Sequence, residues 1–551
     1  MKKGLNYLPI KLVTLLIIFV FCNHSLSAQS YNEILGRPTE STITISILSS
    51  QSIEVYWEYA TVSGLYSLTT PVATVLKDIP FEFDFTSLLP DTKYYYRTRY
   101  RIIGSVATFS SGAEHTFRTQ RAKGSTFSFT LEADEHLYDK KGVRSLYQIC
   151  LANQAADNPD FMLSLGDIFG DDHYPTTITS SQMDLLHKDY RQYLGQICHS
   201  VPFYVCLGNH EGEFAYYLAQ NPPNNIAVYA TLSRKFYYPN PYPNNFYSGN
   251  KDVEPYGMGN PENYYAWTWG DALFVVLDAY RDQCDTSAKP TNWNWSLGLP
   301  QYTWLKNTLE SSTAKYKFVF AHHVRGQGRG GITNAKLFEW GGYEQNGTTW
   351  GFTKNRPGWA KPIHQLFVDN GVNIFFQGHD HLFAHEVLDG VTYQEVPMPS
   401  DSTYEIGMLA NSSAYVSDTL GGSGHLKVTV APEDVKVDFV RAYLPADEVS
   451  GTHHNREVAF SYSVGGSPET GMNESIDSRT INIYPNPAKD QLIVSLPEGT
   501  GDFRIRLTNM VGQIMLESNT ENIDLSSLKR GIYLLNLYSQ KYNLNKKIII
   551  Q

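Results

Sequence analysis

The sequence predicts a multidomain protein with a central α/β domain between two all-β domains. Apolar and polar residues alternate with period two near both ends of the chain, at 43–47 and 503–507, which marks strands with one buried face. Between about residues 122 and 463, short apolar runs alternate with segments of helical character, a pattern typical of layered α/β folds. A length of 551 residues accommodates three or four such domains.

The first domain, residues 29–121, is predicted to be a β-sandwich. Alternation recurs at 53–58 and 94–101. The segment Leu-Leu-Pro-Asp-Thr-Lys-Tyr at 88–94 resembles the corner of fibronectin type III domains, where a tyrosine hydroxyl bonds back to the chain. We therefore expect a fibronectin type III-like domain at the front of the protein.

The central domain is predicted to alternate strands and helices. Strands are expected at 126–131, 161–165, 203–207, 273–277, 317–320 and 372–376, with a return to β alternation at 425–430. Helices are expected at 144–156, 183–194, 302–311 and 361–369. The stretch 221–265 is dense in Asn, Pro, Gly and Tyr, so it is predicted to be a long surface loop.

Five short polar segments each follow an apolar run that is predicted as a buried strand. They are Asp-Glu-His at 134–136, Gly-Asp at 166–167, Gly-Asn-His-Glu at 208–211, His-His at 322–323 and Gly-His-Asp-His at 378–381. Any one of them is weak alone, since Gly-Asp also occurs at 270–271 and 501–502. Side chains at strand ends can converge from distant parts of a sequence, and imidazole with carboxylate suits Zn, Fe or Mn. The set predicts a metal site.

Taken together, the segments resemble the calcineurin-like metallophosphoesterase family over roughly residues 122–440. The resemblance implies a four-layer α/β/β/α sandwich for residues 122–463 and a pair of divalent or transition metal ions, either Fe, Zn or Mn. It implies that Asp167 bridges the ions, with Asp134, His136 and His381 on the first ion and Asn209, His322 and His379 on the second. It further implies attack by a metal-bound hydroxide, while His210 protonates the leaving oxygen or stabilises the transition state.

A fibronectin-like domain in front of such a domain also resembles the purple acid phosphatases. Those enzymes place a tyrosine three positions after the Gly-Asp aspartate, where this chain has Gly170. We therefore predict a colourless site. Many family members carry proline two residues after the histidine that is matched by His322, where this chain has Val324. We assign His322 rather than His323 as the ligand, from the register of the preceding strand.

Several neighbours of these segments keep two interpretations. Arg325 and Arg329 could clamp a phosphate oxygen or be solvated in a loop. Glu211 could orient His210 or face water. His385 could contact the metal ligands and orient them without binding the metal itself. Three further groups are expected to be structural or exposed: Asp171 with Asp172, His453 with His454, and the aromatic residues Tyr237, Tyr238, Tyr242, Tyr247 and Trp267.

Residues 1–28 are predicted to be an export signal. Lys2 and Lys3 precede an apolar core at 12–21, and Leu-Ser-Ala at 26–28 offers a cleavage site. The alternative is a membrane anchor, although the core is short for a bilayer span. After cleavage we expect no transmembrane segment.

The chain ends in a polar linker, 464–478, and a β domain, 479–551. Ile-Tyr-Pro-Asn-Pro-Ala at 483–488, Gly512, Gly-Ile-Tyr at 531–533 and the Lys-Lys-Ile ending resemble the type A sorting domain of the type IX secretion system. The resemblance implies the type IX machinery as a partner and a secreted or cell-surface location, after passage through the periplasm of a Gram-negative bacterium. The alternative is an ordinary β-sandwich binding module.

The net charge of −11 argues against a protein that coats nucleic acid or anionic membranes, but permits a small phosphorylated substrate at a metal centre. No disulfide pairing is assigned among Cys150, Cys198, Cys206 and Cys284. We expect a secreted phosphoesterase, with phosphomonoesters favoured by the domain order. The alternatives are a phosphodiesterase or nucleotide hydrolase, and a surface-displayed binding protein with a vestigial metal site.

Overall fold

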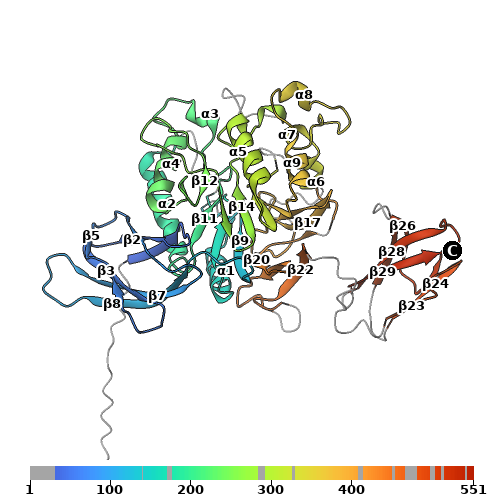
Figure 1. The fold of residues 1–551 in the computed structure, drawn as a ribbon, viewed down its shortest axis with the longest axis horizontal. Coiled ribbons are helices and arrows are strands. Elements are labelled where there is room, and N and C mark those ends of the chain that lie inside the picture. The colour runs from blue at the N-terminus through green and yellow to red at the C-terminus, as the bar shows by residue number, and fades with distance from the viewer. Residues whose placement is uncertain are drawn as a thin grey trace, which may run out of the picture. The chain divides into compact units, whose positions relative to one another are not determined.

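The computed structural model describes residues 31–138, 141–169, 177–282, 292–324, 329–406, 414–417, 419–448, 453–465, 481–496, 503–509, 514–539 and 543–551. Residues 1–465 belong to one compact unit and residues 466–551 to a second (Figure 1). The predicted export signal and nearly all of the predicted linker lie outside the described residues. No helix within the described ranges is both long and apolar enough to cross a membrane.

The N-terminal region is built from paired β-sheets that share an apolar core around Trp57, as the alternation predicted. One sheet runs β1 (Tyr31–Gly36), β2 (Ile43–Ser49), β6 (Phe81–Phe85). The other runs β4 (Leu68–Thr69), β3 (Ile53–Ala60), β7 (Lys93–Ile102), β8 (Ser110–Arg118), with β5 (Ala73–Val75) also on β3. The Leu89 N–H donates to the Tyr94 hydroxyl at 2.8 Å, which is the interaction expected at the corner.

The central region contains a pair of larger sheets. The first runs β11 (Phe203–Val205), β10 (Phe161–Ser164), β9 (Phe127–Glu132), β20 (Gly424–Val430), β21 (Val435–Arg441), β22 (Val458–Val464). The second runs β12 (Ser248–Gly249), β13 (Tyr265–Trp269), β14 (Ala272–Val276), β15 (Tyr316–Phe320), β16 (Ile374–Gln377), β18 (Val391–Glu395), β17 (Phe383–Leu388), β19 (Thr419–Leu420). Within them, β11, β10 and β9 are parallel, and so are β14, β15, β16 and β18.

The two sheets face each other across a core of aromatic and branched residues, including Phe129, Phe274 and Phe376. The outer face of the first sheet packs against α1 (Arg144–Ala156), α2 (Ser180–Leu194) and α4 (Ile226–Tyr237). The outer face of the second packs against α5 (Gly298–Ser311), α7 (Phe338–Gly341) and α9 (Ile363–Asp369). Figure 1 shows the helices on either side of the sheets. The four-layer α/β/β/α prediction is confirmed.

Short elements complete the central region. They are α3 (Ala215–Leu218), the 3₁₀ helix η2 (Asn292–Asn294), α6 (Ile332–Ala335) and α8 (Phe352–Asn355). Helix α1 has the predicted bounds, and α2 begins three residues earlier than predicted because Thr179 and Gln182 form a capping box.

The prediction of a long loop at 221–265 was wrong in part, because helix α4 lies inside it. The Asn225 side chain caps this helix by accepting the Val228 N–H at 3.0 Å. The helix buries an apolar face against α2, and it also buries Arg234, which donates to Glu213 at 2.6 Å. A paired arginine inside the helix hides the apolar face from sequence patterning.

The second unit is also all β. One sheet runs β23 (Asn482–Tyr484), β24 (Gln491–Ser495), β27 (Asn522–Asp524), and the other β26 (Ile514–Ser518), β25 (Phe503–Asn509), β28 (Gly531–Ser539), β29 (Asn543–Ile550). They share a core that includes Leu492, Ile505 and Leu535.

The N-terminal and central regions of the first unit contact each other through polar groups. Arg191 of α2 donates to the Ser46 carbonyl at 2.5 Å, and the Tyr96 hydroxyl donates to the His199 carbonyl at 2.6 Å. The rings of His115 and His199 stack with centroids 3.9 Å apart. Stacked imidazoles tolerate a positive charge poorly, so this contact is sensitive to acid.

We expect this contact to make the first unit less stable in acid. Burial and the neighbouring His199 lower the pKa of His115 to about 3. An unfolded histidine binds its proton near pH 6.5, so below that pH the unfolded chain holds more protons than the folded one. The free energy of unfolding should therefore fall as pH drops from about 6.5 towards 3.

The substitution His115→Gln should remove part of that slope, up to about 1.4 kcal/mol per pH unit. Urea-induced unfolding of wild type and variant at several pH values measures it. Identical slopes for the two proteins would contradict the assignment.

Candidate metal centre

The five polar segments meet because they follow the ends of β9, β10, β11, β15 and β16. Parallel strands end at the same edge of a sheet, so their following loops become neighbours. Backbone hydrogen bonds join these loops. Asp134 N–H donates to Gly166 O at 2.9 Å, and Gly378 N–H donates to His322 O at 2.7 Å. Between the two sheets, His322 Nδ1 lies 2.9 Å from the Leu165 carbonyl, so the loops of both sheets are neighbours.

The backbone of these loops is strained at the residues that carry the side chains. Asp134, His136, Asp167, His379 and His381 have φ values of 62°, 43°, 60°, 78° and 56°. Each is a non-glycine residue in the left-handed region, which costs on the order of 1–3 kcal/mol and persists only where surrounding contacts impose it. Strain at five such residues in one place indicates a functional centre.

The side chains form overlapping groups of potential metal ligands. Their nitrogen and carboxylate oxygen atoms lie within 4.8 Å of one another in the groups Asp134, His136, His381; His136, Asp167, His210; and Asp167, His322, His379.

Asp167 lies between imidazoles of the outer groups. Its Oδ2 is 3.0 Å from His322 Nε2 and 3.9 Å from His136 Nε2. In the first group, His381 Nε2 is 3.3 Å from Asp134 Oδ1. Asp167 therefore belongs to the second and third groups, and His136 to the first and second.

The donors suit cations rather than an internal hydrogen-bond network. Asp134 Oδ1, Asn209 Oδ1 and His381 Nδ1 are buried atoms without a hydrogen-bond partner among the described residues. Buried polar atoms are normally satisfied, and leaving one unsatisfied costs about 1–3 kcal/mol. A lone pair on each of these atoms is available to a metal ion, so the residues present fit such a group.

The electrostatics of the site keep its carboxylates ionised. Burial acts to raise the pKa of Asp167, but the His322 and His210 imidazoles hold that pKa well below its ordinary value. In the same way His381 lowers the pKa of Asp134 against its burial. Burial and the neighbouring His323 lower the pKa of His379, which keeps it neutral. Carboxylate and neutral imidazole are the forms that bind metal ions, so His322, whose pKa the Asp167 carboxylate raises to about 9 against the effect of burial, would release a proton on binding.

His322 and His323 face different partners. His322 is fully buried, and its Nδ1 is 2.9 Å from the Leu165 carbonyl, which leaves Nε2 directed at Asp167. His323 Nε2 lies 3.3 Å from the Tyr280 hydroxyl. This geometry supports the choice of His322 as the ligand.

Asn209 and His210 are brought to the centre by the loop after β11. The His210 N–H donates to Asp167 Oδ1 at 2.7 Å, and the His210 ring lies 5.0 Å from that of His136. His210 is half-buried, unlike the fully covered Asp134 and Asp167, so it lies on the open side of the cluster.

Glu211 has a role that neither sequence interpretation anticipated. It is buried and accepts three backbone N–H groups, from Gly208 at 2.5 Å, Asp167 at 3.0 Å and Ile168 at 2.9 Å. The carboxylate therefore joins the loops after β10 and β11. The position of Glu211 directly after Asn209 and His210 was the signal available in the sequence. The partners of Glu211 are backbone N–H groups, which a sequence does not reveal.

Other sequence candidates lie elsewhere. The His385 ring packs against Tyr462 with centroids 4.1 Å apart, and the His453 ring stacks on Tyr443 at 4.8 Å. Tyr238, Tyr247 and Trp267 are buried in the cores, as expected. Arg325, Gly170, Asp171, Asp172 and Cys284 lie outside the described residues, and Cys150, Cys198 and Cys206 are buried free thiols.

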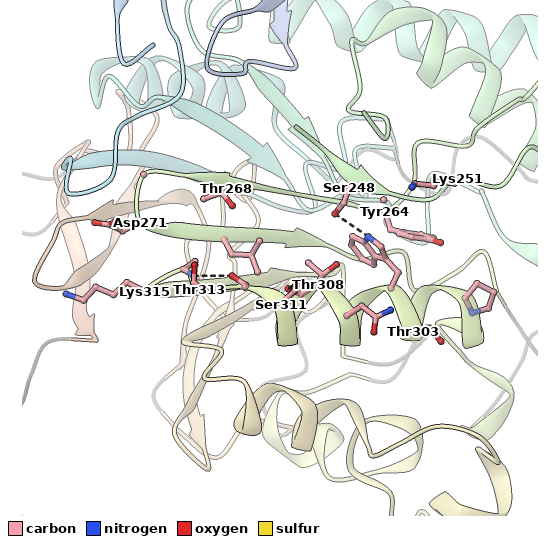
Figure 2. Close-up of a pocket in the computed structure, with 18 of the residues that line it drawn as sticks. Ser248, Lys251, Tyr264, Thr268, Asp271, Thr303, Thr308, Ser311, Thr313 and Lys315 are labelled. Atoms are coloured by element: carbon pink, nitrogen blue, oxygen red, sulfur yellow. Dashed lines mark hydrogen bonds between the residues drawn. The ribbon is translucent and has the colours of Figure 1, made fainter. Parts of the chain in front are cut away.

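A groove of about 910 Å³ is separate from this centre (Figure 2). It lies between α5 and the edge of the second sheet, where the Trp304 indole N–H donates to Ser248 Oγ at 3.3 Å. It includes Asp271 and Lys315, which precede β14 and β15, whereas the metal loops follow the ends of their strands. The groove and the candidate metal ligands therefore lie at opposite ends of these strands.

A four-layer sandwich with clustered Asp and His side chains at its strand ends fits a metal-dependent phosphoesterase. Residues 130–383 match the calcineurin-like phosphoesterase family, and the central domain belongs to it. Residues 482–551 match the secretion system C-terminal sorting domain, so the protein is exported by type IX secretion to the cell surface or the medium. Both family resemblances are confirmed.

Solved structures share the architecture at low identity. One described as the structure of PhoD is 16% identical, with a TM-score of 0.53, over 74% of this chain and 86% of its own. The purple acid phosphatase PPD1 from yellow lupin (Lupinus luteus) seeds is 14% identical, with a TM-score of 0.52, over 80% and 77%. These matches show the fold. No curated protein matches the chain.

Replacing Glu211 by Ala should destabilise the central domain by about 3 kcal/mol or more, because three buried N–H groups lose their acceptor. Urea-induced unfolding measures the change. The control is Glu310→Ala, which removes only an exposed pair with Lys306 and should cost less than about 1 kcal/mol. Equal effects of the two substitutions would refute the role of Glu211.

Proposed function

We propose that this protein is an exported enzyme that hydrolyses phosphate esters, phosphomonoesters first, at a dinuclear metal centre. The observation that carries the proposal is the position of Asp167, whose carboxylate faces His322 on one side and His136 on the other. A carboxylate shared by two ligand groups suits a pair of cations about 4 Å apart.

The proposed ligands combine two groups of neighbouring atoms, Asp134 with His136 and His381, and Asp167 with His322 and His379, and add Asn209. Asp134, His136 and His381 would hold one ion and Asn209, His322 and His379 the other, with Asp167 common to both. Fe, Zn and Mn suit these nitrogen and oxygen donors. When bound, such a pair activates a water molecule and neutralises charge on the phosphoryl group.

The chain itself supplies orientation and a proton. Asp167 accepts the His210 N–H and thereby holds His210 beside the shared carboxylate, on the open side of the cluster. We assign His210 the transfer of a proton to the leaving oxygen, or stabilisation of the transition state. Backbone bonds through Glu211 keep the loops of Asp167 and His210 at a fixed separation.

The choice of phosphomonoesters is supported by domain order. We propose that a β-sandwich at 29–121 precedes a phosphoesterase domain at 122–463, an order supported by the similarity of the fold to that of a purple acid phosphatase. We further propose that 1–28 is removed as an export signal and that 464–478 links the sorting domain, 479–551. Because fold similarity does not determine the substrate, phosphomonoesters are the first class of substrate to assay.

The proposal is tested with 4-nitrophenyl phosphate and bis(4-nitrophenyl) phosphate, using purified protein supplied with Mn, Fe or Zn. We expect faster hydrolysis of the monoester. Preference for the diester would replace the substrate class with phosphodiesters. Absence of hydrolysis of either ester with every metal would favour a binding protein.

Asp167→Asn should lower kcat by more than about 100-fold while the fold persists, because the shared carboxylate is lost. The matched control is Asp271→Asn, since Asp271 also follows a glycine but lies at the opposite ends of the strands. It should retain wild-type kcat. Substantial activity in Asp167→Asn would contradict the shared-ligand role.

A further inference from the structure

A buried polar network lies directly behind the turn that carries His379 and His381. Its members are Asp380, Arg329, Tyr415 and Glu395, none of which belongs to the proposed ligand set. We propose that Arg329 and Tyr415 are positioning residues, which act through Asp380 to orient the His379–His381 turn and so set the affinity of the centre for metal ions. The inference rests on the proposed function only in taking these histidines as metal ligands.

Asp380 is the hub of the network. It is buried between the two histidines, and its Oδ2 accepts the Tyr415 hydroxyl at 2.8 Å and the Gly330 N–H at 2.7 Å. Its Oδ1 accepts Arg329 Nη1 at 2.9 Å. The carboxylate therefore has partners on both oxygens and a paired positive charge, which buried acids require.

Glu395 on β18 fixes the same turn from the second sheet. Its Oε1 accepts the Asp380 N–H at 3.0 Å, and its Oε2 lies 2.9 Å from the Tyr415 hydroxyl and 2.6 Å from Gln377 Nε2. A tyrosine has one hydroxyl hydrogen, and the Tyr415 hydroxyl lies within hydrogen-bond distance of both carboxyl groups, Asp380 and Glu395. Burial raises the pKa of Glu395 well above its ordinary value.

The network fixes the backbone of the turn as well as Asp380. Arg329 Nη1 also donates to the His379 carbonyl at 2.9 Å, while the His379 N–H donates to Asp134 Oδ2 at 2.7 Å. Both peptide groups flanking His379 are thus held. Left-handed conformations at His379 and His381 need such imposed contacts, because they are unfavourable by themselves.

The contacts of Arg329 add a third role to its two sequence interpretations, a phosphate clamp and a solvated loop residue. The Arg329 guanidinium pairs with Asp380 and donates to the His379 carbonyl, so it contacts the His379–His381 turn. Residues that orient metal ligands typically affect metal affinity by 10–100-fold. A residue that only adds stability would leave affinity unchanged.

The test is titration of the metal-free full-length protein with Mn²⁺ by isothermal titration calorimetry, for wild type, Arg329→Gln and Tyr415→Phe. We expect each variant to raise Kd for Mn²⁺ by about 10-fold or more. The matched control is Tyr393→Phe, which also removes a buried hydroxyl near Glu395 on β18, but one that bonds to His364 Nδ1 at 2.8 Å. It should leave Kd within twofold of wild type.

Kd values within twofold of wild type for Arg329→Gln and Tyr415→Phe would overturn the inference, as would an equal loss in Tyr393→Phe. If Tyr415→Phe does not fold, Arg329→Gln decides, since the Arg329 side chain is 35% exposed and its replacement does not open the core. If the wild type binds Mn²⁺ but hydrolyses neither ester with Mn, Fe or Zn, the proposed function is refuted and the Kd values still decide this inference. A wild type that binds none of these three metal ions would refute both.

Discussion

The structure depends on holding several ionisable side chains together where strands of two sheets end. Taking charge out of water is costly unless opposite charges and hydrogen bonds compensate. Here the two aspartates face imidazoles, and Asp167 also accepts a backbone N–H. Parallel strands direct their loops to one edge of a sheet. Short loops from several strands therefore provide the ligand atoms together, and no single long polar segment is needed.

Two buried carboxylates outside the ligand set maintain that arrangement. Glu211 joins the loops after β10 and β11 on the first sheet, and the Asp380 carboxylate joins the turn after β16 to Arg329 on the second. The Asp380 backbone N–H also donates to Glu395 on β18. Both carboxylates bond mainly to backbone N–H groups or to fixed side chains. The strained residues of the site are therefore enclosed by contacts that leave them little freedom, which is the condition for a preorganised centre.

Short-range rules predicted the strands and grouped the candidate residues, whereas the four layers and the assignment of ligands to ions followed from the family resemblance. Apolar runs mark strands, and the polar residues after them mark the edge of a sheet, so Asp134 and His381 could be grouped although they lie far apart in the chain. Helix α4 was missed because Arg234, paired with Glu213, interrupts its apolar face. The partners of Glu211 and Asp380 depend on backbone donors and on Tyr415, which tertiary structure alone brings together.

The central claim is that Asp167 is shared by two metal ions. Its most direct test is a crystal structure of the protein grown with Zn²⁺ or Mn²⁺, in which anomalous scattering locates the ions. If Asp167 is shared, two peaks should appear, each about 2.0–2.2 Å from an oxygen of the Asp167 carboxylate, with Asp134 and His322 on opposite ions. A single ion, or ions bound without Asp167, would contradict it.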